Sequence, residues 1–109
     1  MADITLKRGD SINWNCSLID DQSNPIDITN YTIRTQGKDS ERTVTLFSLT
    51  NGNGVTITSG ANGAYQIQLL DTSSFGLGNF DVDIEFTDSN GIVNSTQTFT
   101  LEIVEDVTI

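Results

Sequence analysis

The sequence predicts an all-β protein. Apolar and polar residues alternate over several short segments, and this two-residue period is typical of half-buried strands. Clusters of Gly, Asn and Asp separate most of these segments. No segment carries the longer period of an amphipathic helix. Many short strands without helices favour a two-sheet, antiparallel, immunoglobulin-like β-sandwich of about eight strands, with a closed barrel as the alternative.

The N-terminal half contains five of the expected strands. In Ser11–Ile19, apolar side chains occupy one face, and Asn13, Asn15 and Ser17 occupy the other. Asp20–Pro25 is a cluster of turn residues that holds the only proline and ends this segment. The expected strands of this half are Ile4–Leu6, Ser11–Ile19, Tyr31–Thr35, Thr43–Leu49 and Val55–Thr58.

The C-terminal half contains three strands and the clearest alternation. Two Gly/Asn connectors, Asn51–Gly54 and Ser59–Gly63, lead into it and suit positive backbone φ angles. Asp71–Phe75 is the one place where a short helical turn is expected. Asp88–Gly91 lies between apolar segments and predicts a hairpin loop. The expected strands are Tyr65–Leu69, Phe80–Phe86 and Phe99–Ile103.

A single domain over residues 1–109 with one hydrophobic core is expected, because the 109-residue chain has neither a linker nor a repeat. Trp14 should lie between the sheets, so Trp14→Ala should cost roughly 3–5 kcal/mol. Cys16 points to the same face of the strand as Trp14 and is expected to be a small buried packing residue rather than a nucleophile. The expected core comprises Ile12, Trp14, Cys16, Leu18, Tyr65, Ile67, Leu69, Phe80, Val82, Ile84, Phe86, Phe99 and Leu101.

The composition disfavours several classes of function. Fifteen acidic residues against five basic ones give a net charge of -10, which disfavours binding to nucleic acid and to anionic membranes. The absence of His and the single Cys exclude Cys/His zinc sites and imidazole-based triads. No apolar run reaches the roughly 20 residues of a membrane span, and no signal peptide is visible. We therefore expect synthesis in a cytoplasm, no enzymatic activity and no cofactor.

An acidic stripe is the first candidate for chemistry. Asp81, Asp83 and Glu85 should share one strand face, with about 7 Å between successive carboxylates along the strand. Paired carboxylates at such separations can hydrolyse glycosides, but no aromatic platform accompanies these. A solvated face, or a charged face that discourages edge pairing, is the favoured interpretation.

Calcium is the second candidate. The loops that contain Asp20, Asp21 and Asp88 are rich in oxygen ligands, but neither loop has EF-hand spacing. Because turn formation accounts for both loops, we expect no metal site and no response of the melting temperature to calcium.

A series of landmarks runs through almost the whole chain. They are Leu6–Asp10 (LKRGD), Pro25–Asn30 (PIDITN), Gly63–Ile67 (GAYQI), Gly78–Ile84 (GNFDVDI), Thr87–Gly91 (TDSNG) and Phe99–Thr108 (FTLEIVEDVT). Their order resembles small β-sandwich domains of tailed bacteriophages and prophages, such as the N-terminal domain of phage baseplate upper proteins. The resemblance implies a non-enzymatic virion structural protein of the tail, baseplate or fibre attachment. It also implies synthesis in the host cytoplasm, contacts with other virion proteins and a homo-oligomer in the particle.

Two other roles stay open. One is an Ig-like host-surface or carbohydrate-binding module, for which Tyr31, Phe47, Tyr65 and Phe75 are the available aromatics. The other is an acidic inhibitor of a host nucleic-acid-binding protein.

Apolar alternation continues almost to both termini, where chains usually fray. These segments are therefore expected to pair into the sheet or to dock on a neighbour. The candidate contact residues are Ile4, Leu6, Val107 and Ile109.

Overall fold

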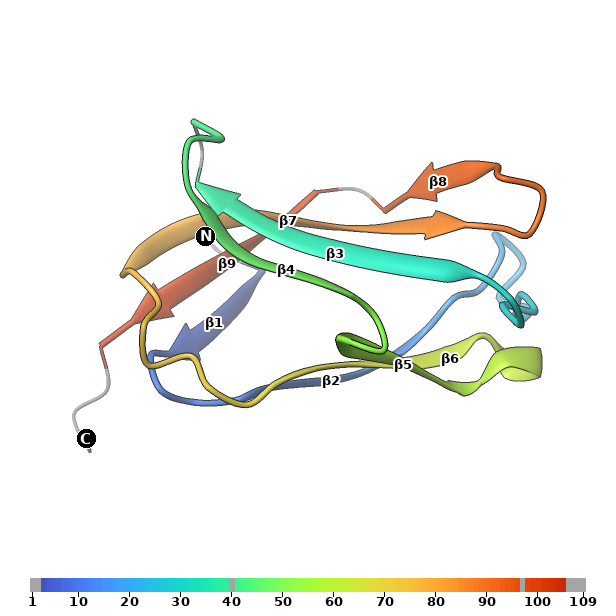
Figure 1. The fold of residues 1–109 in the computed structure, drawn as a ribbon, viewed down its shortest axis with the longest axis horizontal. Coiled ribbons are helices and arrows are strands. Elements are labelled where there is room, and N and C mark those ends of the chain that lie inside the picture. The colour runs from blue at the N-terminus through green and yellow to red at the C-terminus, as the bar shows by residue number, and fades with distance from the viewer. Residues whose placement is uncertain (1–2, 40, 97, 106–109) are drawn as a thin grey trace.

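The computed structural model describes residues 3–39, 41–96 and 98–105, and this part of the chain is all-β (Figure 1). A single 3-10 turn, η1 (Gly60–Asn62), is its one helical element. No helix within the described ranges is long and apolar enough to cross a membrane. The strands are β1 (Ile4–Lys7), β2 (Ile12–Ser17), β3 (Thr32–Asp39), β4 (Thr45–Asn51), β5 (Gly54–Ser59), β6 (Ala64–Leu69), β7 (Gly78–Thr87), β8 (Val93–Ser95) and β9 (Phe99–Val104).

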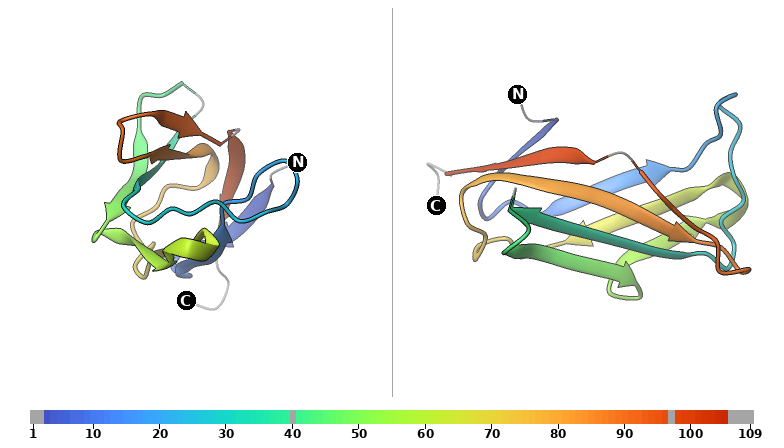
Figure 2. Two further views of the ribbon diagram at one scale, coloured as in Figure 1. Left: turned by 90° about the vertical axis from the view of Figure 1, so that its right-hand side faces the viewer. Right: turned by 90° about the horizontal axis from the view of Figure 1, so that it is seen from above.

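The strands form one curled, mixed sheet in the order β1-β9-β7-β3-β4-β5-β6-β2, with β8 paired to β7 (Figure 2). The expected fully antiparallel pairing is wrong, because β1–β9 and β4–β5 are parallel pairs. The β4–β5 pair joins what would otherwise be two sheets, since Thr50 lies opposite Gly54 and Asn51 opposite Val55. The sheet therefore turns this corner without losing its hydrogen bonding, and its ends curl toward each other as a half-barrel.

The core fills the inside of the curl. Its fifteen buried apolar residues include all four inward side chains of β7, which the alternation of Phe80–Phe86 predicts. Ile28, Phe47 and Phe75 also belong to this core, although they are not among the expected core residues. Other expected core residues are only half-buried against it, because they lie on or beside β2, β6 and β9, which are close to the two ends of the open sheet. These half-buried residues are Trp14, Cys16, Leu18, Leu69 and Phe99.

The short helical turn lies at a different place from the expected one. Asp71–Phe75 makes a single turn, in which the Phe75 N–H donates to the Thr72 carbonyl at 3.0 Å. The Thr72 hydroxyl is buried and donates to the Asp10 carbonyl at 2.6 Å, while it accepts from the Gly9 N–H at 2.9 Å. These bonds hold the segment against the β1–β2 turn, and Phe75 enters the core, so the chain does not continue into a helix.

The predicted connectors occur as expected. Asp88–Gly91 closes the β7–β8 hairpin, where the Gly91 N–H donates to the Asp88 carbonyl at 3.0 Å. Gly52 and Gly63 have φ angles of 80° and 69°, within the two Gly/Asn connectors. Strand β8 was not predicted, because its three residues are all exposed and carry no apolar alternation.

Candidate functional site

The acidic stripe lies on the outer face of β7, in the interior of the sheet. Strand β7 pairs with β3 along one side and with β8 and β9 along the other. A role in discouraging edge pairing is therefore wrong for this stripe, because β7 is not an edge strand. The β3–β7 register places a basic or amide residue opposite each carboxylate: Lys38 opposite Asp81, Gln36 opposite Asp83 and Arg34 opposite Glu85.

Two ion pairs on this face connect β7 to β3 and to the β3–β4 hairpin. Arg34 lies 3.5 Å from Glu85, and Arg42 lies 2.5 Å from Asp81. The arginine side chains are about half exposed, so each pair contributes less than about 1 kcal/mol to stability. Three of the five basic residues of the chain are thus gathered against its most acidic strand.

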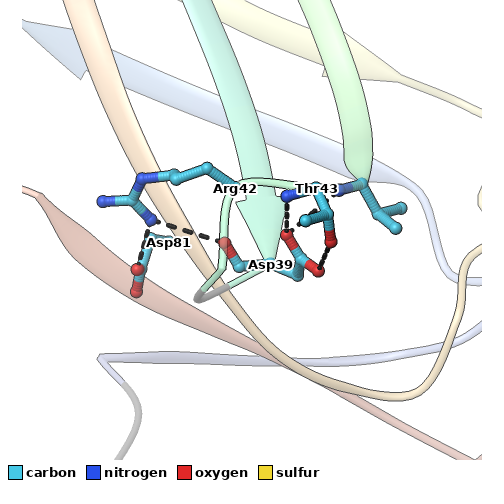
Figure 3. Close-up of polar contacts among 5 residues, drawn as sticks. Asp39, Arg42, Thr43 and Asp81 are labelled. Carbon is cyan, nitrogen blue, oxygen red and sulfur yellow. Dashed lines mark hydrogen bonds and ion pairs between the residues drawn. The ribbon is translucent and has the colours of Figure 1, made fainter.

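The position of Arg42 depends on the β3–β4 hairpin (Figure 3). Asp39 Oδ1 accepts from the Thr43 N–H at 2.7 Å and from the Val44 N–H at 3.0 Å, and Asp39 Oδ2 accepts from the Thr43 hydroxyl at 2.7 Å. These hydrogen bonds, above all the one from the Thr43 side chain, lower the pKa of Asp39. The closed turn brings the Arg42 guanidinium to Asp81 across the end of β3.

An open groove of about 330 Å³ lies on this face. It mixes cations with carboxylates, and Arg42 already engages Asp81 within it. A glycosidase pair needs one carboxyl held protonated by an apolar, enclosed surrounding, which this solvent-open groove does not provide. The groove is lined by Gln36, Lys38, Arg42, Asp81, Val82, Asp83 and Thr98.

Two of the three calcium candidates, Asp20 and Asp88, act as turn formers. Asp20 Oδ1 accepts from the Gln22 and Asn24 N–H groups, both at 2.9 Å. Asp88 Oδ1 likewise accepts from two N–H groups of the β7–β8 loop at 2.9 Å. Asp21 is exposed on the β2–β3 connection, which lies at the same end of the molecule as the β7–β8 loop (Figure 1). Within the described residues, no group of three or more His, Cys, Asp or Glu side chains could hold a metal ion.

Cys16 is half-buried in β2, opposite Tyr65 of β6. Its thiol lies 3.8 Å from the Trp14 carbonyl, to which it can donate. Burial raises the pKa of Cys16, and burial together with the nearby thiol raises that of Tyr65. A thiol held in its protonated form is a poor nucleophile, so this geometry supports packing rather than chemistry.

The N-terminal contact candidates belong to the chain's own sheet. Ile4 lies opposite Leu101, and Leu6 lies opposite Ile103, in the parallel β1–β9 pair. Both side chains are half-buried against the core, so of the two expected alternatives the N-terminal segment shows pairing into the sheet. Val107 and Ile109 lie outside the described residues.

Most of the exposed large apolar side chains lie in the connections between strands, and one lies at the start of β8. In the described part of the chain, six large ones have exposed fractions between 49% and 66%. The β2–β3 connection, the β7–β8 turn and the first residue of β8 carry three of them at or beside one end of the long axis, and the β3–β4 and β6–β7 connections carry the others toward the opposite end (Figure 1). They are Ile19, Ile92 and Val93 at the first end, and Val44, Leu70 and Leu77 toward the second.

The sequence contains a weak sign of this arrangement. Leu70 directly follows Leu69 and so breaks the alternation of β6, and Val93 directly follows Ile92. Comparison of the chain with protein-family models and with curated proteins found no match.

Proposed function

We propose that the chain is a non-enzymatic structural component of a phage virion, at the tail, baseplate or fibre attachment, that assembles through protein–protein contacts. The observation that carries the proposal is the placement of exposed apolar side chains toward the two ends of an elongated module of 42 × 27 × 26 Å. Exposed apolar residues on or beside connections favour contacts with other proteins. The resemblance of the LKRGD segment and the later landmarks to phage tail-associated domains supplies the virion context.

We also propose that the curled sheet is a variant of the Ig-like sandwich that the resemblance implies. Contacts across the inside of the curl support this. The rings of Trp14 on β2 and Phe99 on β9 lie 6.1 Å apart edge to face, and those of Tyr65 on β6 and Phe86 on β7 lie 5.6 Å apart. In this description, the β4–β5 corner joins the two layers of the sandwich.

The alternative roles receive less support from the side chains. A carbohydrate platform needs exposed aromatic faces, but Phe47, Tyr65 and Phe75 are buried and Tyr31 is half-buried. An acidic inhibitor would offer its carboxylates to a basic partner, whereas Arg34 and Arg42 already pair with the acidic stripe. Neither role is favoured by a specific observation.

Mass spectrometry of purified particles from the source organism tests the proposal. We expect the chain to co-purify with tail structural proteins at a constant copy number per particle. Particles that lack the chain, prepared from cells in which it is abundant, would contradict a structural role. A chain found free and bound to a basic host protein would favour the inhibitor instead.

A further inference from the structure

Strand β2 has one hydrogen-bonding edge that no described strand covers. Among the described strands its one partner is β6, in a regular antiparallel register. Just beyond this pair, the Leu18 N–H donates to the Gly63 carbonyl at 2.8 Å. Antiparallel strands exchange bonds at every second residue, so the even-numbered residues of β2 face β6. The backbone N–H and C=O groups of Asn13, Asn15 and Ser17 therefore point to the free edge.

This edge lacks the features that usually prevent edge pairing. Such features are charged side chains, proline, bulges and short length. Strand β2 (INWNCS) is six residues long and contains neither a charged residue nor proline, in a chain of net charge -10. Its pairing with β6 has no register shift, unlike the β3–β4 and β5–β6 pairs. By comparison, β8 is only three residues long, and β1 has four residues and ends in Lys7.

The two ends of β2 carry opposite charges. Lys7 and Arg8 precede the strand and outnumber Asp10 in the same turn, which the Asp10 N–H closes by donating to the Lys7 carbonyl at 2.9 Å. Asp20 and Asp21 follow the strand. Antiparallel pairing of two copies would place the basic end of each β2 beside the acidic end of the other. Parallel pairing would place like charges together, so the charge pattern selects the antiparallel arrangement.

We propose that two copies of the chain associate edge to edge through antiparallel β2 strands, which continues the sheet across a two-fold axis. Such an interface is self-complementary, because each strand offers the same row of donors and acceptors to the other. The uncharged Asn13, Asn15 and Ser17 side chains would lie along the join, so the contact brings no like charges together at its centre. This interface deepens the proposed assembly role. Its test uses only the purified chain, so its failure would be distinct from absence of the chain from particles.

The first experiment measures the oligomeric state of the full chain by analytical ultracentrifugation over a range of concentrations. Asn15→Pro removes a free-edge N–H, and Asn15→Lys places a charge beside the join. Each change occurs twice in the dimer, so we expect either variant to raise the dissociation constant about tenfold or more.

Thr56→Lys is the matched control for this experiment. Thr56 is exposed on β5, and Gln66 connects it across β6 to Asn15 on the same face, so the control adds the same charge away from the edge. It should leave the dimer unchanged. A wild-type chain that is monomeric at every concentration would overturn the proposal, as would equal effects of Asn15→Lys and Thr56→Lys. If Asn15→Pro does not fold, the comparison of Asn15→Lys with Thr56→Lys still tests whether the β2 edge forms the dimer contact.

The second experiment tests the antiparallel arrangement by charge reversal at about physiological ionic strength, where screening limits long-range repulsion between the acidic bodies. Lys7→Glu and Asp21→Lys should each weaken the dimer, and the double variant should recover much of the loss. Losses that simply add in the double variant would exclude the proposed pairing of opposite ends.

Discussion

Gly63 lies where three backbone segments meet. It follows η1 with a φ of 69°, and its carbonyl accepts from the Leu18 N–H at 2.8 Å. A Cβ at this position would lie 2.5 Å from the Leu18 carbonyl oxygen and 2.7 Å from that of Ile26. Only glycine satisfies both the left-handed conformation and this close approach. The residue thus joins the end of β2 and the β2–β3 connection to the start of β6.

We expect Gly63→Ala to lower the free energy of unfolding by about 2 kcal/mol or more, through backbone strain together with displacement of neighbouring carbonyls. Gly52→Ala is the control, because Gly52 also has a positive φ (80°) but a Cβ added there would have no other atom within 4 Å. It should cost about 1 kcal/mol. Urea denaturation of both variants measures the difference. Equal losses would mean that the close approach at Gly63 has no energetic effect.

The β3–β4 hairpin is the element whose stability should depend most clearly on pH. The hydrogen bonds from Thr43 and Val44 stabilise the ionised form of Asp39 and so lower its pKa. Since the folded pKa lies below the unfolded one, the contribution of this carboxylate is present at neutral pH. It is lost as the pH falls through the ordinary carboxyl range and down through the lowered value.

Asp39→Asn should therefore destabilise the protein at neutral pH, and the deficit should shrink as the solution is acidified. The measurement is the free energy of unfolding of wild type and variant at about pH 7 and about pH 2.5, on either side of the carboxyl titration range. Asp27 and Asp71 also have lowered pKa values from turn hydrogen bonds, so only the difference between wild type and variant isolates Asp39. A deficit that is the same at both pH values would contradict this account.

At the scale of the whole molecule, the open curl of the sheet determines how much each core residue contributes to the free energy of unfolding. Ile67 lies on β6 between β5 and β2 and is fully buried, whereas Trp14 lies on the edge strand and is half-buried. The ring contact with Phe99 bridges the two ends of the curl without backbone pairing between β2 and β9. We therefore expect the largest loss of stability from truncation of Ile67, at the centre of the sheet, rather than of Trp14.

We expect Ile67→Ala to cost about 2–5 kcal/mol, because it removes fully buried methyl groups and leaves a cavity. Trp14→Ala should cost less, about 1–3 kcal/mol, in place of the larger value that full burial would imply. Chemical denaturation of both variants gives the comparison. A larger loss for Trp14→Ala would show that closure of the curl by the Trp14–Phe99 contact dominates stability.

Local residue patterns were sufficient to locate most strands and turns. The period of two in Phe80–Phe86 predicts which side chains enter the core, because successive side chains of a strand point to opposite faces. The turn at Asp88–Gly91 follows from the hydrogen bonds that Asp and Gly make within a few residues. These features depend on neighbours along the chain, so the sequence alone identifies them.

The pairing partners and the sheet edges depend on contacts between distant segments. Ile4 lies opposite Leu101 in a parallel pair of strands that no local sequence pattern predicts. The same holds for the acidic stripe: its carboxylates are evident in the sequence, but only the β3–β7 register shows that Arg34 faces Glu85. The half-burial of Trp14 and the free edge of β2 were likewise decided by the tertiary structure. The alternation marks which side of a strand is apolar, but the curl of the whole sheet determines how far that side is covered.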